Sequence, residues 1–129
     1  MIPSNYHTHT HFCDGKNSPE EMVLQAISLG CPELGFSGHS YTDFDPEPSM
    51  NPSEAAAYAK EINALKEKYE GRIEIYLGIE QDIYSPEPPF SPDYIIGSVH
   101  YLDVGGEKVS VDNTAALAED AVNRCFGGD

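Results

Sequence analysis

The chain has 129 residues, with 22 acidic residues against 7 lysines and arginines, and a formal net charge of −15. This length suits one domain, but it is about half of a typical α/β barrel of ~250 residues. The strong negative charge argues against a protein that binds the phosphate backbone of nucleic acids.

Strand and helix signals alternate along the chain. Two segments begin with a polar capping residue, a proline and then glutamate, Ser18-Pro19-Glu20-Glu21 and Asn51-Pro52-Ser53-Glu54, which is typical of helix starts. Gly30 is the expected left-handed stop of the first helix, and Gly71 is expected to end the second. The expected elements are strands near residues 4–8, 34–37, 73–79 and 94–99, and helices over 19–29, from 52 to the stop at Gly71, and over 114–125.

The resulting order of elements, β-α-β-α-β-β-α, is typical of an α/β fold with a parallel sheet. Gly105-Gly106 is expected to form a turn in a loop or hairpin before the last helix. In a parallel α/β fold the carboxyl ends of the strands lie on one face, so residues that follow different strands meet there.

Metal-ligand candidates recur at the points where the chain is expected to leave a strand. Because imidazole nitrogens and carboxylate oxygens bind divalent metals, their joint placement at one face predicts a metal site. The candidates are His7, His9, Asp14, His39, Glu80 and His100.

Each candidate also has a plain structural interpretation when it is taken alone. A single His-x-His pair often occurs by chance, and Asp14-Gly15 suits an ordinary turn. His39 and His100 suit loop residues, and Glu80 a solvated strand end. His11 continues the alternation of His7 and His9 but is interpreted as a bystander. The metal-site hypothesis therefore rests on the whole set.

Three cysteines, Cys13, Cys31 and Cys125, form no Cys-x-x-Cys pair, so they are expected to be reduced and partly buried thiols. No apolar run approaches the ~18 residues of a transmembrane helix, and the first residues lack the features of a signal peptide. We therefore expect a cytoplasmic protein without membrane or nucleic-acid partners.

The motifs around these candidates resemble those of the polymerase and histidinol phosphatase (PHP) superfamily. They are His7-Thr8-His9 with Cys13-Asp14-Gly15, Phe36-Ser37-Gly38-His39-Ser40, Gly78-Ile79-Glu80 and Ile96-Gly97-Ser98-Val99-His100. The segments 13–22 and 76–86 further resemble the bacterial monofunctional histidinol-phosphate phosphatases.

This resemblance implies a distorted (β/α)7 barrel, of which the chain would supply about four strands and three helices. It also implies a cluster of up to three divalent metals, Zn, Mn or Fe. By the family pattern the first metal would be held by His7, His9 and Glu80, the second by Glu80 and His100, and the third by Asp14 and His39.

The activity that the resemblance implies is hydrolysis of L-histidinol phosphate to L-histidinol and phosphate, a step of histidine biosynthesis. Glu80, His100 and Asp14 would carry the catalytic metals, and Lys16 would contact the substrate. Two other functions stay open: a PHP-type phosphodiesterase or nuclease, and an incomplete fragment that binds metal or associates with itself.

The chain also departs from the family pattern. Family members continue further and supply a later histidine and an Asp-x-His pair, whereas His100 is the last histidine here. We therefore expect one PHP domain over residues 1–129 that corresponds to the amino-terminal half of the enzyme, with activity far below that of a complete relative.

Four strands cannot close a barrel, so we expect open sheet edges and a homodimer or higher assembly. The residues that would face the open interior, and so partly face water, are expected to be Phe36, Ile75, Leu77, Ile95 and Val99.

Overall fold

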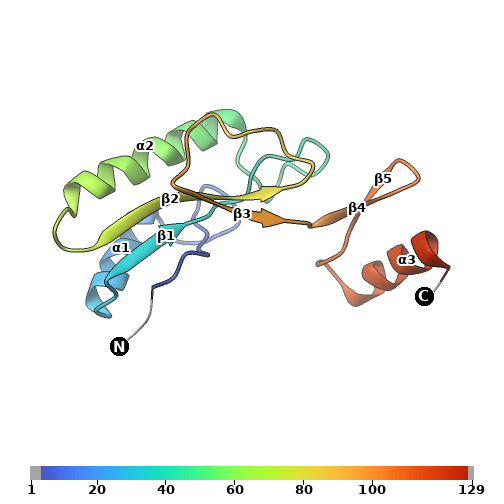
Figure 1. Cartoon of the computed structure of the whole chain (residues 1–129), viewed down its shortest axis with the longest axis horizontal. Helices are drawn as coiled ribbons and strands as arrows, with labels where there is room; N and C mark the ends of the chain where they lie inside the picture. Colours follow the sequence, from blue (N-terminus) through green and yellow to red (C-terminus); the bar gives the residue numbers. More distant parts are fainter. Residues whose placement is uncertain (1–3, 128–129) are drawn as a thin grey trace. The chain divides into compact units, whose positions relative to one another are not determined.

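The computed structural model describes residues 4–127, which form two compact units. The boundary falls between Gly97 and Ser98, within the last residues of a strand. The first unit contains two helices and a three-stranded sheet, and the second contains a hairpin and a helix (Figure 1).

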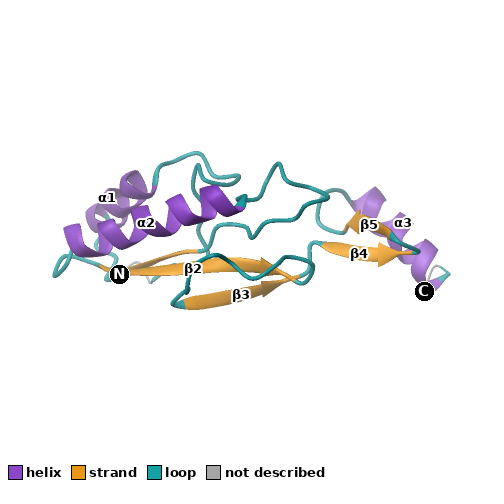
Figure 2. Cartoon of the chain, turned by 90° about the horizontal axis from the view of Figure 1, so that it is seen from above, coloured by secondary structure: helices purple, strands orange, loops and turns teal. Residues whose placement is uncertain are grey.

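The first unit is built on a three-stranded sheet. Its strands are β1 (Glu33–Phe36), β2 (Glu74–Asp82) and β3 (Tyr94–Ser98), in the order β1-β2-β3. β1 and β2 are parallel, with Phe36 opposite Leu77. The arrows of β2 and β3 point the same way in Figures 1 and 2. The expected α/β fold class with a parallel sheet is confirmed.

Two helices cover one face of this sheet (Figure 2). They are α1 (Pro19–Ser28) and α2 (Pro52–Lys68). Both start with the expected capping boxes, in which Ser18 and Asn51 bond to the backbone of the third helical residue and that glutamate bonds back. Gly30 follows α1 with a φ of +72°, which favours glycine. The predicted helix starts are therefore confirmed.

The core lies between these helices and the sheet. Phe36, Tyr58 and Ile62 are fully buried there, and burial of such side chains contributes roughly 1.5–3 kcal/mol each. The expectation that Phe36, Ile75 and Leu77 would face the open interior is wrong, because all three are buried within the core cluster. The alternation of β2 puts Ile75 and Leu77 on the helix side, whereas Ile95 of β3 is 57% exposed.

The face of the sheet that points away from the helices carries the alternate residues of β2. Tyr76, Gly78 and Glu80 share this face of β2. The ring of Tyr6 contacts both Tyr76 and Tyr94, with ring centroids 5.6 and 5.7 Å apart. Glu80, a predicted ligand, therefore shares a face with these aromatic rings.

Two predicted strand boundaries are wrong. Residues 4–8 form no regular strand but a single parallel bridge between Asn5 and Leu34. β2 runs on to Asp82, so Glu80 lies within the strand instead of following it. The extension is stabilised by the segment after β1, because Glu80 N donates to Gly38 O and Ser40 N donates to Glu80 O, at 3.0 and 2.9 Å.

The second unit consists of an antiparallel hairpin and a helix. The hairpin strands are β4 (Tyr101–Val104) and β5 (Glu107–Ser110), and the helix is α3 (Ala115–Phe126). The predicted turn is present at Gly105 and Gly106, whose φ values of 66° and 92° match a type I′ turn. The two short strands were not predicted. Fully buried Ala121 marks the face by which α3 packs on the hairpin.

Within residues 4–127, none of the helices combines the length and the apolar character that crossing a membrane requires.

Candidate metal centre

Three histidines converge on one carboxylate oxygen of the first unit. Glu80 is only 5% exposed, and its Oε2 lies 3.1 Å from His7 Nε2. The same oxygen lies 3.3 Å from His9 Nε2 and 3.3 Å from His39 Nδ1. His7 and His9 lie on the segment before α1, and His39 lies on the segment after β1. Glu80 lies in β2.

A second carboxylate, Asp14, contacts two of the same rings. Its Oδ1 lies 3.0 Å from His9 Nδ1, and its Oδ2 lies 3.2 Å from His39 Nε2. Burial by itself raises the pKa of Asp14, but the neighbouring His39 and His9 rings outweigh it, so the pKa lies below its ordinary value. Asp14 is therefore an anionic ligand candidate at neutral pH.

This arrangement has more carboxylate contacts than neutral imidazoles can satisfy by hydrogen bonding. A carboxylate oxygen has about two lone-pair sites, whereas Glu80 Oε2 meets three imidazole nitrogens. A neutral imidazole has one N–H, yet both nitrogens of His9 and of His39 face carboxylate oxygens. A cation among these atoms resolves both conflicts.

The donor atoms fit divalent metals in type and spacing. His7, His9 and Glu80 form one group, and His9, Asp14 and His39 form another, each with its ligand atoms within 4.8 Å of one another. Zinc–ligand bonds of ~2.0–2.1 Å place the corners of a tetrahedron about 3.3 Å apart. The separations of 3.0–3.3 Å around Glu80 and Asp14 match that spacing.

A pair of residues fixes the segment between His7 and His9. Buried Thr8 receives a hydrogen bond from Ser37 N at 2.9 Å and donates its own N–H to Ser37 Oγ at 3.1 Å. Ser37 is fully buried and lies two residues before His39. The same contact therefore sets the spacing between the His7–His9 segment and the His39 segment.

The turn at Asp14 requires glycine at the next position. Cys13 N and Gly15 N both donate to Thr10 O at 3.0 Å, which folds the chain back toward His9. A Cβ at Gly15 would lie 2.5 Å from the carbonyl carbon and oxygen of His9. The predicted Asp14-Gly15 turn is present, and it is what brings Asp14 back to the histidines.

Tyr58 of α2 holds the backbone next to two candidate ligands, His39 and Glu80. Its hydroxyl donates to Gly78 O at 2.9 Å and accepts from Gly38 N at 3.4 Å. Gly38 precedes His39, and Gly78 lies two residues before Glu80. Burial raises the pKa of Tyr58, so the hydroxyl keeps its proton for this role. The sequence showed only its place in the apolar stripe of α2, which gave no signal of this contact.

The remaining cysteine and histidine predictions have mixed outcomes. The thiol of Cys13 lies 3.6 Å from His9 Nδ1, and burial raises its pKa. All three cysteines are free, and Cys31 is partly buried like Cys13, but Cys125 is exposed, which corrects the expectation of partial burial. His11 is exposed and its ring contacts Phe12, consistent with a bystander.

Lys16 and His100 are the two other predicted site residues. Lys16 is exposed, two residues after Asp14. His100 belongs to the second unit, where it precedes β4 and its Nε2 lies 3.0 Å from Ser98 Oγ and 3.9 Å from Asp112 Oδ2. The roles of Lys16 in substrate binding and of His100 as a ligand stay predictions.

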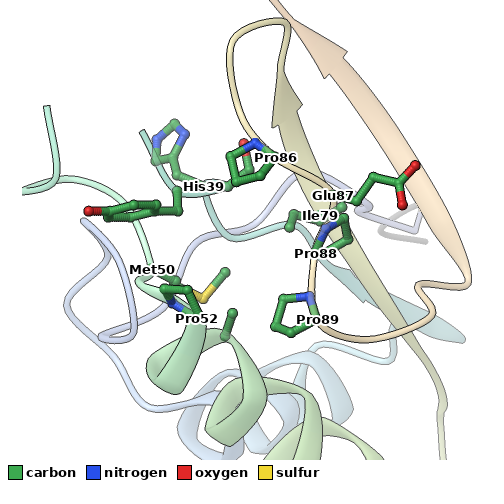
Figure 3. Close-up of a pocket in the computed structure, with 11 residues that line it drawn as sticks. His39, Met50, Pro52, Ile79, Pro86, Glu87, Pro88 and Pro89 are labelled. Carbon is green, nitrogen blue, oxygen red and sulfur yellow. The ribbon is translucent and has the colours of Figure 1, made fainter. Parts of the chain in front are cut away.

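A small pocket lies next to His39 (Figure 3). Met50 and Pro52 line one side, and Ile79 with the loop from Pro86 to Pro89 lines the other. Its volume of about 30 Å³ suits water or a methyl-sized group, since a single water needs roughly 10–15 Å³ on this scale. The pocket is therefore too small for a metabolite.

Known proteins similar to this chain share one enzyme name. A protein of Deinococcus radiodurans named "Probable histidinol-phosphatase" is 31% identical over 129 aligned residues, which cover 88% of this chain and 46% of the relative. The histidinol-phosphatase of Lactococcus lactis subsp. lactis is 32% identical over 114 residues, which cover 79% of this chain and 40% of the relative. The chain thus spans less than half the length of either relative.

The fold is similar to a solved structure as well. The crystal structure of histidinol phosphate phosphatase from Lactococcus lactis, complexed with Zn, L-histidinol and phosphate, matches with a TM-score of 0.69 and 28% identity. The match covers 87% of this chain and 44% of that one. The PHP domain model matches residues 5–124. This chain belongs to the PHP domain family.

Proposed function

We propose that this protein is a metal-dependent phosphomonoesterase that hydrolyses L-histidinol phosphate to L-histidinol and phosphate. The observation that carries the proposal is the convergence of His7, His9 and His39 on Glu80 Oε2 at 3.1–3.3 Å. Support for the substrate comes from the similarity to the Lactococcus enzyme, whose structure contains Zn, L-histidinol and phosphate.

We infer separate tasks for the ligand groups. His7, His9 and Glu80 would hold one metal, and Asp14 with His39 would hold another, with His9 placed between the two groups. His100 is proposed as a further ligand. Bound divalent metals supply positive charge next to a phosphate and lower the pKa of a water molecule.

The protein residues supply position and charge. The backbone of Glu80 is fixed by bonds on both sides, from its N–H to Gly38 and from Ser40 to its carbonyl, and the residue is buried. The side chain of Asp14 is 47% exposed, at the solvent side of the cluster. Lys16 follows on this exposed segment, and we propose that its ammonium group contacts the substrate phosphate.

The metal could be zinc, manganese or iron, since neutral imidazoles and carboxylates suit all three. Zinc is favoured by its presence in the related structure. We place the protein in the cytoplasm, because the cysteines Cys13, Cys31 and Cys125 are all free thiols, which suits a reducing compartment.

An assay of phosphate release tests the proposed activity. With Zn²⁺ or Mn²⁺ added, the chain is expected to release phosphate from L-histidinol phosphate, and a chelator is expected to stop the reaction. The variant Glu80→Gln, which keeps the size of the side chain but loses its charge, serves as the inactive control. Faster metal-dependent cleavage of a phosphodiester would favour the nuclease alternative, and metal binding without either reaction would favour the metal-binding module.

We further infer that copies of the chain associate through the outer edge of β3. Within residues 4–127 no strand pairs with this edge, and Ile95 on it is 57% exposed. Unpaired apolar edges favour strand pairing between molecules, and a lysine on the edge opposes it. Analytical ultracentrifugation is expected to show concentration-dependent dimers for the wild type and monomers for Ile95→Lys. A wild type that stays monomeric at all concentrations would contradict this.

A further inference from the structure

The segment that carries His7 contains an extra residue relative to β1. Gly35 N donates to Asn5 O at 2.8 Å, and Ser37 N donates to Thr8 O at 2.9 Å. The two donors on β1 are two residues apart, whereas the two acceptors on the His7 segment are three residues apart. In a regular parallel pair, successive donors and successive acceptors are each two residues apart. The residues between Asn5 and Thr8 therefore form a bulge. Such bulges occur next to active sites, where they redirect a side chain.

Side chains satisfy the backbone groups that the bulge removes from regular pairing. His7 N donates to the side chain of Asn5 at 3.1 Å. Thr8 Oγ1 donates to Gly35 O at 2.7 Å, where a regular ladder would place a backbone N–H. Tyr6 O, in the middle of the bulge, accepts from the hydroxyl of Tyr94 at 2.6 Å. Of these three contacts, only the one from Tyr94 reaches the bulge from beyond β1.

Tyr94 is itself held in one position. Its hydroxyl also lies 2.8 Å from Phe36 O, so its single proton serves two carbonyls, one before His7 and one on the strand that leads to His39. The ring lies against two glycines, since an added Cβ would be 2.5 Å from its hydroxyl at Gly35 and 2.3 Å from its ring at Gly78. Tyr6 packs edge-on against it at an interplanar angle of 86°.

His7 depends on this backbone geometry more than its neighbours do. Its side chain is 52% exposed, compared with 22% for His9 and 19% for His39, so little packing restrains it. The orientation of its ring toward Glu80 is therefore set mainly by the bulge from which it projects.

We propose that Tyr94 is a positioning residue for the metal centre: its hydroxyl holds the bulge at Tyr6 and so directs His7 toward Glu80. The proposal rests on the proposed function as far as metal binding is concerned. The holding of the bulge can be tested on the metal-free chain, which separates the two questions.

The test compares Tyr94→Phe, which removes only the hydroxyl, with Tyr76→Phe. The ring of Tyr76 also contacts Tyr6, but its hydroxyl has no hydrogen-bond partner in the described part of the chain. In the metal-free protein, hydrogen exchange of the amides of residues 7 and 8 is expected to become about fivefold faster in Tyr94→Phe, the loss equivalent to one net hydrogen bond. The amides of α2 are expected to exchange hydrogen at the wild-type rate in both variants.

A second measurement follows Co²⁺ binding by its visible absorption. Tyr94→Phe is expected to bind Co²⁺ about 10–100-fold more weakly, the usual effect of removing a group that supports a ligand, with an altered spectrum. Tyr76→Phe is expected to match the wild type. Unchanged exchange at residues 7 and 8, or equal acceleration throughout the protein, would overturn the proposal. A wild type that binds no Co²⁺ would count against the proposed function, and the exchange rates would still decide the role of Tyr94.

Discussion

The double variant His7→Ala/His9→Ala is expected to retain almost no zinc after dialysis, whereas the wild type retains it. The two rings supply two of the three ligand atoms in the group with Glu80, and His9 also belongs to the group with Asp14. Loss of a supporting group alone reduces metal affinity by about 10–100-fold, so loss of two ligands should reduce it by more than 100-fold. Elemental analysis of the dialysed protein measures the bound metal.

His11→Ala is the matched control for this experiment. His11 lies on the same segment, but it is exposed and contacts Phe12 instead of the cluster. We expect this variant to bind as much zinc as the wild type. Equal metal content in the wild type and the double variant would show that the cluster at Glu80 is not a metal site.

Gly78→Ala is expected to lower the free energy of unfolding by about 1–3 kcal/mol, the usual cost of adding a methyl group to a packed site. The added Cβ would lie 2.3 Å from the ring of Tyr94, closer than atoms can approach. The ring cannot simply move away, because its hydroxyl is bonded to two backbone carbonyls. Urea denaturation followed by circular dichroism measures the change.

Gly97→Ala provides the comparison, since Gly97 is also a strand glycine but an added Cβ there meets no atom within 4 Å. We expect it to unfold at nearly the same urea concentration as the wild type. In the Gly78→Ala background, Tyr94→Ala should cost less stability than it does alone, because it removes the clash. Equal stability of Gly78→Ala and Gly97→Ala would contradict the close packing of Tyr94.

The parts of the fold that were predicted correctly depend on local signals. The capping boxes at Ser18 and Asn51 and the glycine after α1 lie within a few residues of the helix ends that they determine. The end of β2 was predicted too early, because its extension to Asp82 depends on pairing with residues 38–40, far away in sequence. The strands of the second unit have only four residues each, which is too short for a clear alternation pattern.

The candidate site shows the same division. The pattern of residue types predicted that six ligand candidates would meet. Five of them, His7, His9, Asp14, His39 and Glu80, lie together in the first unit, and the role of His100 stays a prediction. The supporting residues were not predicted. Ser37, Tyr58 and Tyr94 act through contacts with residues 20 to 88 positions away, and in the sequence they look like ordinary strand and helix residues.

The hydrogen bond from Tyr94 to Tyr6 joins residues 88 positions apart in the sequence. This separation affects the order in which the chain can fold during synthesis. Chains leave the ribosome from the amino terminus, and early segments begin to fold before later ones exist. The segment with His7 and His9 is made before β3, but its bulge gains the hydrogen bond from Tyr94 only after that residue has emerged. The ligands of this segment must therefore wait for β3 before they take their final positions, so the order of synthesis delays their placement until Tyr94 is available.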